Sequence, residues 1–473
     1  MTPSQRSPDE LPVAALIAPD ILALLEESPA DIAAEVEEMH PADLADVAEL
    51  LPENLLPAFF KALPAARAAD VLEYLDEEVR THLLEALSAE DAAELIEHMT
   101  PDDRADVLEE LDEDRAEEIL EEMDEAKAEE TEQLLRYDSD VAGGLMTTEY
   151  ISVDEKISVE QALEEVRGAA RSGRREAIYA VYTKDPEGRL SGVVSLRELL
   201  AAPPGSRVAD VAWMEVVRVP PTADREEVAR AASDYDLIAV PVVSESGHLM
   251  GVVTVDDVID AIQEEQTEDV QKLGGMEALE EPYMSIGFVD MIRKRVGWLS
   301  ILFVGSLFTA AAIEFFQGEL DKVDILTLFI PLIISSGGNS GSQATSLIIR
   351  AMALGEIAPR DWWRVARREL LFGLVLGLLL GSLGFFRVLV WNWMGWNSVP
   401  TSHPWLIALT IGGAVFGVVT FGSLVGSMLP FLLRRLGLDP ASASAPFVAP
   451  LVDVTGLIIY FSVALLVLRG TLL

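Results

Sequence analysis

Residues 447–468, FVAPLVDVTGLIIYFSVALLVL, form an apolar stretch about as long as a helix needs to be to cross a bilayer. Its one charged residue is Asp453. An ionised carboxylate that faces lipid costs on the order of 3 kcal/mol or more, and no basic residue of the same stretch is placed to pair with it. A cavity containing water and a cation would remove that cost. We therefore expect a membrane helix here, with Asp453 on an ion path.

Four further apolar stretches have similar lengths, at about 297–316, 325–349, 370–391 and 405–433. Only helices satisfy their own backbone hydrogen bonds in lipid, so five membrane helices are predicted. The loops between these stretches alternate between basic and nonbasic. By the positive-inside rule the basic loops lie in the cytosol, which places the amino-terminal half in the cytosol and the C-terminus outside. The basic loop residues are Arg293, Lys294, Arg295, Arg360, Arg364, Arg367, Arg368, Arg434 and Arg435, and the other loops carry Glu319, Asp321 and Asp324, or Trp391, Trp393, Trp396 and His403.

The second stretch contains PLIISSGGNSGSQATSLIIR, residues 331–350. Its proline and the glycines around Gly337 and Gly338 should weaken the helix and expose backbone carbonyls, which membrane proteins tolerate only beside protein or water. Asn339 and Gln343 lie one turn apart and would present amide oxygens on one face. A polar packing seam between helices is the alternative. Glu314, near the end of the first stretch, could lie at the membrane surface.

Oxygen ligands in this half favour a hard cation. Mg²⁺ prefers oxygen and sheds its water reluctantly, so one carboxylate with amides could hold it through its hydration shell. A softer metal would be expected to recruit His or Cys, and the membrane half contains only His403.

Charge divides the 473 residues into two parts. The first 283 residues contain 21 of the 34 Lys and Arg residues and 70 of the 80 Asp and Glu residues, a net charge of −49, whereas the remainder carries +3. So acidic a region would repel nucleic acid and anionic lipid and suits cations, although excess acid can also serve solubility alone. The absence of cysteine excludes disulfides and thiolate metal sites. The start, MTPSQRSPDELP, has no secretory signal pattern and is expected in the cytosol.

An apolar residue recurs every 12 positions from Met39 to Leu135, usually with an apolar pair three and four residues before it. Prolines such as Pro41 and Pro101 punctuate the pattern. This spacing predicts short helices, each with one buried face, stacked as a superhelix. Their acidic outer faces are mostly expected to be ordinary solvated surface.

Residues 143–202 and 207–263 then run through one order of elements twice: a helix, a β-branched strand, a polar glycine turn, a second strand and a second helix. The segments SGVVS and MGVVTVDD hold corresponding places in the two copies, and the tandem resembles a CBS pair, a regulatory module. The stretch 264–283, EEQTEDVQKLGGMEALEEPY, is charged and helix-like, and could transmit motion or be a spacer. Scattered histidines and the lack of a phosphate-binding Gly-Lys loop indicate no enzyme site.

Several motifs in one order, namely PDDRAD, the CBS pair, TEDVQKLG, GGNSGSQ, MLPFLLRRLGLDP and PLVDVTGLIIY, resemble the MgtE family of magnesium channels and transporters across nearly the whole chain. The resemblance implies a multidomain membrane protein and a homodimer with a pore at its axis. The expected parts are an all-α superhelical N-terminal domain (20–140), an α/β tandem CBS pair (141–205 and 206–263), a connecting plug helix (264–290) and a five-helix transmembrane domain (291–473).

The same resemblance implies site residues. Asp453 would hold hydrated Mg²⁺ in the pore, beside Gly337, Gly338, Asn339 and Gln343. Leu237 stands where the family often has an aromatic residue near its nucleotide site, which leaves ATP as an open question. The other carboxylates that match family metal ligands are Asp70, Asp102, Asp106, Asp224, Glu226, Asp236, Asp257, Asp260, Glu265, Glu268, Asp269 and Asp439.

The expected function is Mg²⁺ uptake across the plasma (inner) membrane, with Mg²⁺ as both substrate and regulator. Cytosolic Mg²⁺ would screen the facing carboxylates and close the pore, and its loss would let them repel one another. The alternatives are a CBS-regulated transporter of another divalent cation such as Co²⁺, and a membrane-anchored sensor that transports nothing.

Overall fold

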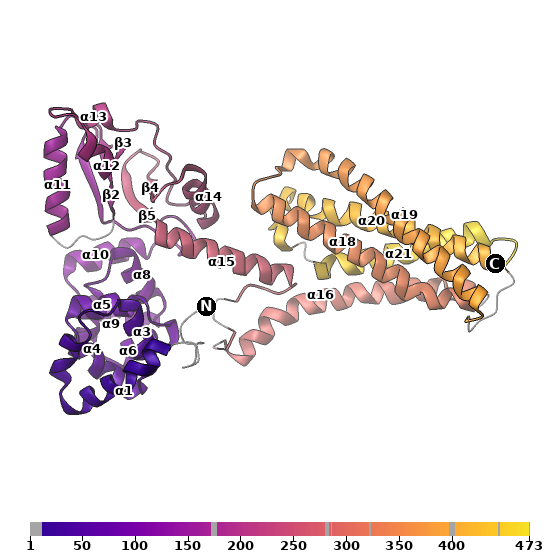
Figure 1. Cartoon of the computed structure of the whole chain (residues 1–473), viewed down its shortest axis with the longest axis horizontal. Helices are drawn as coiled ribbons and strands as arrows, with labels where there is room; N and C mark the ends of the chain where they lie inside the picture. Colours follow the sequence, from indigo (N-terminus) through magenta and orange to yellow (C-terminus); the bar gives the residue numbers. More distant parts are fainter. Residues whose placement is uncertain are drawn as a thin grey trace. The chain divides into compact units, whose positions relative to one another are not determined.

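The computed structural model describes residues 12–171, 177–279, 283–284, 286–320, 323–396, 403–442 and 445–472 (Figure 1). The chain divides into two compact units, Met1–Glu265 and Gln266–Leu473. Each unit is described by itself.

Short helices open the first unit, and from Pro41 onward a new helical segment begins every 12 residues. This confirms the period read from the sequence. Leu72, Leu84, Ile96 and Leu108, also 12 residues apart, are fully buried in one continuous core. The helices are α1 (Pro12–Glu27), α2 (Ile32–Glu35), α3 (Pro41–Glu49), α4 (Leu56–Ala62), α5 (Ala65–Glu73), α6 (Glu77–Ala86), α7 (Ala89–Ile96), α8 (Pro101–Glu109), α9 (Glu113–Glu122) and α10 (Glu125–Leu134), with 3₁₀ turns η2 (Pro29–Asp31) and η3 (Glu53–Leu55).

Two α/β copies follow, in the predicted order of elements. The first copy contains one strand more than the sequence pattern indicated, β1, which pairs parallel with β2 in a three-stranded sheet of order β1-β2-β3. The second copy has the antiparallel pair β4-β5. The elements are β1 (Tyr150–Asp154), α11 (Val159–Arg171), β2 (Ala177–Lys184), β3 (Leu190–Ser195), α12 (Leu196–Ala201), α13 (Val208–Val211), α14 (Arg225–Tyr235), β4 (Ala239–Val243), β5 (Leu249–Thr254) and α15 (Val255–Leu273).

The connecting helix differs from the expected span of 264–290. Helix α15 begins at Val255, so the last helix of the second CBS copy and the start of the connector are one helix, and it ends at Leu273. Gly275 has a φ of +73°, a left-handed conformation that suits glycine and terminates helices. The next helix begins only at Phe288.

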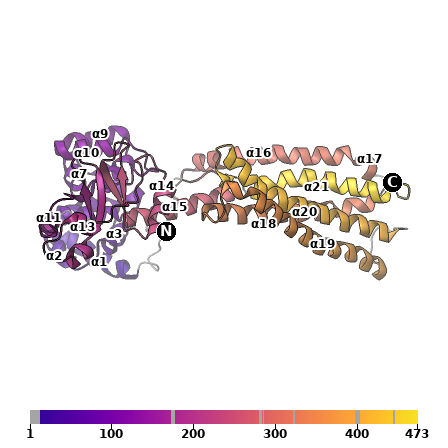
Figure 2. The same cartoon turned by 90° about the horizontal axis from the view of Figure 1, so that it is seen from above.

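The second unit contains five helices long and apolar enough to cross a membrane, as predicted (Figure 2). Helix α20 packs against α18, α19 and α21, whereas α16 packs chiefly on α21 and has no buried residue. The helices are α16 (Phe288–Phe315), α17 (Gln317–Leu320), α18 (Ile330–Ala353), α19 (Trp362–Met394), α20 (Pro404–Arg435) and α21 (Ala445–Leu468), with 3₁₀ turns η4 (Asp324–Phe329), η5 (Pro359–Asp361) and η6 (Pro440–Ser442).

The prediction that glycines break the second span is wrong, because α18 is one continuous helix and Pro331 lies in its first turn, where proline is tolerated. The glycines instead permit close packing. A Cβ on Gly337 would lie 2.7 Å from Val452 of α21, and one on Gly341 would lie 2.8 Å from Val448. Gly337 is buried and packs closely against Val418 and Val452, and its place beside an ion path stays a prediction.

Candidate functional site

A group of carboxylates gathers in the first unit, and we refer to it as the acidic cluster. Helix α5 contributes one acid at its end, and the first turns of α8 and α15 contribute most of the others. The helix dipole stabilises negative charge in the first turn of a helix, which offsets part of the repulsion between neighbouring acids there. Its members are Glu73, Asp102, Asp103, Asp106, Asp256, Asp257 and Asp260.

Asp102 is the buried centre of this cluster. It is only 4% exposed, and its Oδ1 has no hydrogen-bond partner among the described residues. Asp103 beside it accepts a hydrogen bond from the Thr100 hydroxyl at 2.5 Å, and Asp257 accepts one from Thr254 at 2.8 Å. A buried carboxylate oxygen without a partner is rare and calls for water or an ion.

Burial and mutual repulsion raise the pKa values of the cluster. Burial first, and the charge of Asp103 second, raise the pKa of Asp102 to about 7. Loss of hydration, followed by the charges of Asp102 and Asp103, raises the pKa of Asp106 to about 8. Loss of hydration also raises the pKa of Glu73 to about 8, with Asp103 the largest of its charged neighbours. The pKa of Asp257 is raised for the same two reasons, burial and then Asp102.

The chain itself supplies little positive charge here. Burial raises the pKa of Asp103, and the hydrogen bond from Thr100 and the charge of the Arg80 guanidinium oppose this only in part. Arg80 is itself ion-paired with Glu110. Within the described ranges, no three His, Asp or Glu side chains converge as a ready-made metal site. The donors are all carboxylates, which fits a hard cation such as Mg²⁺ held partly through its own water. The acidic cluster therefore fits a hard cation in two respects: all its donors are carboxylate oxygens, and Oδ1 of Asp102 has no hydrogen-bond partner among the described residues.

Asp70 borders this cluster, since its charge also raises the pKa of Glu73. The structure thus brings together four of the residues predicted from the sequence: Asp102, Asp106, Asp257 and Asp260.

Glu265 has a different environment from the one expected of a metal ligand. Its Oε1 lies 2.7 Å from Nε of Arg225, whose guanidinium also lies 2.8 Å from Glu264 and 2.8 Å from Asp140. Arg225 is 13% exposed on its side chain, so this is a partly buried ion network. A cation supplied by the chain occupies the place beside Glu265.

Glu268 and Asp439, both in the second unit, are likewise paired with a basic side chain of the chain itself. The Lys272 ammonium forms ion pairs with both, at 2.6 Å from Oδ2 of Asp439. Burial alone would lower the pKa of Lys272, but the hydrogen bonds to the two carboxylates outweigh it and raise the pKa. Asp269, the neighbour of Glu268 in α15, is half-buried.

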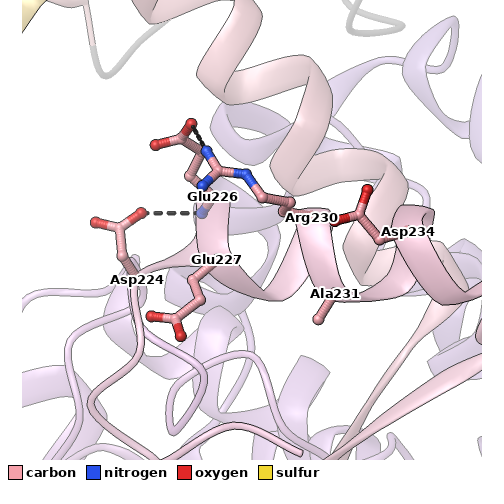
Figure 3. Close-up of a pocket in the computed structure, with 6 residues that line it drawn as sticks. All are labelled: Asp224, Glu226, Glu227, Arg230, Ala231 and Asp234. Carbon is pink, nitrogen blue, oxygen red and sulfur yellow. Dashed lines mark hydrogen bonds and ion pairs between the residues drawn. The ribbon is translucent and has the colours of Figure 1, made fainter. Parts of the chain in front are cut away.

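Figure 3 shows the surface pocket along α14, which Asp224, Glu226, Glu227, Arg230, Ala231 and Asp234 line. Asp224 caps the helix by accepting the backbone N–H of Glu226 at 2.9 Å, and Glu226 pairs with Arg230 at 2.6 Å. Both roles are structural ones that acids commonly have on a helix. Asp236 lies at the far end of α14, where it adopts a φ of +51°.

The predicted ion-path residues lie on α18 and α21. Asp453 is half-buried, and no basic residue of the described part of the chain forms an ion pair with it. A Cβ on Gly338 would lie 3.9 Å from its Oδ1, so the carboxylate lies beside Gly338 of α18. Asn339 and Gln343 are both exposed on one face of α18.

Three members of the acidic cluster and both basic partners were missed by the sequence prediction. Asp103 and Asp256 adjoin predicted acids, and Glu73 lies three residues after Asp70, on the same face of a helix. These spacings could have pointed to them. Lys272 lies four residues after Glu268, a common spacing for helical ion pairs that could have pointed to it. No local pattern reveals the contacts of Arg225 with Glu264, 39 positions away, and of Lys272 with Asp439, 167 positions away.

Known protein families match this architecture part by part. The model described as a divalent cation transporter, MgtE, matches residues 330–463, and the MgtE intracellular N domain model matches residues 39–140. The CBS domain model matches residues 140–205 and 208–264.

Curated relatives include magnesium transporters named MgtE. The one from Thermus thermophilus is 46% identical over 341 residues, which are 72% of this chain and 73% of the relative. The one from Enterococcus faecalis is 35% identical over 72% of each chain, and the one from Bacillus subtilis 29% identical over 70% of each.

Solved structures also resemble the chain. The soluble part of a magnesium transporter has a TM-score of 0.50 at 30% identity and covers 53% of this chain and 99% of its own. The cytosolic domain of the Mg²⁺ channel MgtE in complex with ATP has a TM-score of 0.48 at 40% identity, covering 50% of this chain and 97% of its own.

Proposed function

Because this chain belongs to the MgtE family of magnesium transporters, we propose that its transported ion passes Asp453 and that its acidic cluster senses cytosolic Mg²⁺. The chain is a membrane protein that transports Mg²⁺, and it is not an enzyme. The route and the control of transport are the parts proposed here.

The half-buried carboxylate of Asp453 carries the proposal for the route. It lies in an apolar helix, against Gly338 and with no ion-pair partner in the described residues, so an ionised Asp453 is stable only beside water and a cation. The exposed amides of Asn339 and Gln343 follow one face of the neighbouring helix α18. We propose that Mg²⁺ passes these oxygens with most of its hydration shell retained.

The exposed polar face of α18 also supports a homodimer. Asn339 and Gln343 should not face lipid, because polar side chains in hydrocarbon are costly. A second copy related by a two-fold axis would place two such faces and two Asp453 carboxylates around one water-filled path. Helix α16, which has no buried residue within one chain, would gain cover in the same assembly.

The acidic cluster supplies a mechanism for closure. Two carboxylates about 5 Å apart, at an effective dielectric constant near 20, repel by roughly 3 kcal/mol, so a few such pairs can shift a two-state gate. Bound Mg²⁺ would remove that repulsion and hold α8 against the start of α15. Asp102, Asp106 and Asp257 are the proposed ligands, with Asp103 and Glu73 beside them.

The remaining assignments rest on the family resemblance. We place the chain in the plasma (inner) membrane, with the two cytosolic domains inside and the C-terminus outside, as the basic loops favour. The resemblance also predicts regulatory ligands at Asp70, Asp224, Glu226, Asp236, Asp260 and Asp269. Within one chain Asp224 caps α14 and Glu226 pairs with Arg230, so a role for these two in binding Mg²⁺ would need a second copy of the chain. For nucleotide, direct titration of the full chain with ATP decides whether the CBS pair binds it.

Mg²⁺ flux into liposomes containing the purified full chain tests the route. Asp453→Ala should abolish the flux while a dimer of normal size remains, and Asp361→Asn, which alters an acid paired with Arg364 at the start of α19, should not change it. Normal flux through Asp453→Ala would overturn the route. Repeating the assay with Co²⁺ separates a magnesium pathway from a general divalent one.

Closure is tested separately in the same liposomes. High Mg²⁺ on the face that carries the first unit should stop flux in the wild type. Asp102→Asn combined with Asp257→Asn should leave flux running at high Mg²⁺, because the cation loses its ligands. Retained closure in that variant would refute the sensor.

A further inference from the structure

The end of α15 is fixed to the membrane unit by a basic side chain. Lys272 lies in the last turn of this helix, and its ammonium pairs both with Glu268, one turn earlier, and with Asp439 in the loop between α20 and α21. The three side chains are 26%, 25% and 38% exposed, so the contact is partly shielded from water. Shielding makes such a pair stronger than a fully exposed one.

Asp439 is itself rigidly held. Its Oδ1 accepts the backbone N–H of Ala441 at 2.8 Å, and its backbone carbonyl accepts the N–H of Ser442. These bonds form the 3₁₀ turn η6 that leads into α21, the helix that carries Asp453. Lys272 therefore joins the connecting helix to the segment from which the proposed pore helix begins.

Neighbouring residues seat the same end of the helix. Leu273 packs against the hydrophobic core of the second unit, and the side chain of Gln271 accepts the N–H of Leu279 at 2.6 Å. Gly275 turns the chain beneath Trp298, where an added Cβ would lie 2.8 Å from Cδ1 of the indole. The Trp298 ring lies 5.9 Å from that of Phe447 in α21.

Lys272 places one ammonium between two carboxylates, Glu268 in its own helix and Asp439 in the loop before α21. We propose that Lys272 is a built-in latch, a positioning residue that keeps the end of α15 docked on the loop before α21 without any bound metal. In this view the lysine provides the positive charge that Mg²⁺ would otherwise have to supply between these two acids. Docking is thus independent of Mg²⁺ at this point. The effect on flux rests on the gating proposed above, whereas the docking itself does not.

Hydrogen exchange of the purified full chain, measured with EDTA and again with Mg²⁺, tests the latch. The reporters are the N–H groups of Gly274 and Gly275, which bond to the carbonyls of Val270 and Lys272 at 3.0 and 2.9 Å. In EDTA, Lys272→Met should speed their exchange about fivefold, as loss of a partly buried ion pair predicts, and Mg²⁺ should restore the protection. The wild type should be protected in both solutions.

Matched variants keep the test specific. Lys272→Arg retains a cation and should keep the protection, and the exchanged pair Lys272→Glu with Asp439→Lys should recover much of what Lys272→Glu alone loses. Arg293→Met removes an exposed ion pair with Asp290 from the same unit and should leave the reporters unchanged. Protection in EDTA that survives Lys272→Met, or an exchanged pair no better than the single variant, would overturn the latch.

Flux distinguishes the latch from the gate. If the latch and the gate are both correct, Lys272→Met should conduct more than the wild type at low Mg²⁺. A gate failure would appear as unaltered closure in the variants of Asp102 and Asp257, with the exchange result at Gly274 and Gly275 unaffected.

Discussion

Two acidic regions of this molecule contain the same residue types in opposite electrostatic states. The acidic cluster has seven carboxylates, with Arg80 beside them already paired to Glu110. In contrast, the acids at 264–268 and Asp439 are balanced by Arg225 in the first unit and Lys272 in the second. A match to a family ligand position therefore does not by itself make an acid responsive to Mg²⁺, because the chain has supplied a cation in one region and not in the other.

The largest expected effect is a pH dependence confined to the acidic cluster. The pKa values of Asp102, Asp106 and Glu73 are raised to about 7, 8 and 8, so between about pH 4 and pH 8 the folded cluster binds more protons than the unfolded chain. Their contribution to stability is complete below about pH 4 and is lost as the pH rises through these values. In EDTA, the unfolding temperature of the first unit should fall by about 10 °C from pH 5.5 to pH 8.5.

Scanning calorimetry of the full chain measures this fall. Mg²⁺ should cancel most of it, because a bound cation replaces the missing protons. The unfolding of the second unit serves as the internal control. An unfolding temperature of the first unit that stays level or rises with pH in EDTA would show that the cluster is not short of positive charge.

Asp102→Asn should have the next largest effect. The substitution removes a buried carboxyl group whose pKa is raised to about 7, so at pH 8 and in EDTA the first unit should unfold about 6 °C higher. The added stabilisation by Mg²⁺ should shrink at the same time. Asp43→Asn, which changes an acid in the first turn of α3, is the control and should do neither. A lower unfolding temperature in EDTA would mean that Asp102 is needed as a carboxylate for packing.

Arg225→Met should convert a balanced region into an unbalanced one. It leaves Asp140, Glu264 and Glu265 without their shared guanidinium, and loss of one partner from a partly buried network costs roughly 2 kcal/mol, or about 4 °C. The stabilisation by Mg²⁺, measured by the same calorimetry, should become larger than in the wild type. Arg230→Met, which breaks only an exposed i,i+4 pair, should shift unfolding by less than about 1 °C.

The parts of the fold that follow a period were predictable from the sequence. The 12-residue repeat gave the helices from Pro41 onward, and length with hydropathy gave the five long helices. Strand β1 was missed because YISVD is a short run beside a helix pattern. The continuity of α18 was missed because glycine weakens an isolated helix, whereas here Val418 and Val452 pack directly against Gly337.

The candidate sites were predictable only as far as single residues. Motifs pointed to Asp102, Asp106 and Asp257. Their pKa values are raised, however, because the fold buries these acids and brings acids of three helices near one another, and Glu73 becomes a member of the acidic cluster only through the fold. The partner of Glu268, Lys272, lies four residues later and follows a local helical spacing, but the partner of Glu265 is Arg225, 40 residues away, and the other contact of Lys272 is Asp439, 167 residues away. Charge balance between distant residues is a property of the fold, so sequence patterns could not supply it.

The smallest change in unfolding temperature is expected for a substitution in the α14 pocket. This pocket tests whether exposed acids behave like the balanced region. Glu226 is exposed, pairs with Arg230 and lies among acids that bulk water can hydrate, so it resembles the balanced region more than the acidic cluster. Glu226→Gln should change the unfolding temperature by less than about 1 °C, with or without Mg²⁺. Isothermal titration of the full chain with Mg²⁺ is the more sensitive measurement. A weaker or missing binding step in Glu226→Gln would show that a second copy of the chain completes a metal site at α14, and the division between balanced and unbalanced acids would then have to be drawn for the dimer.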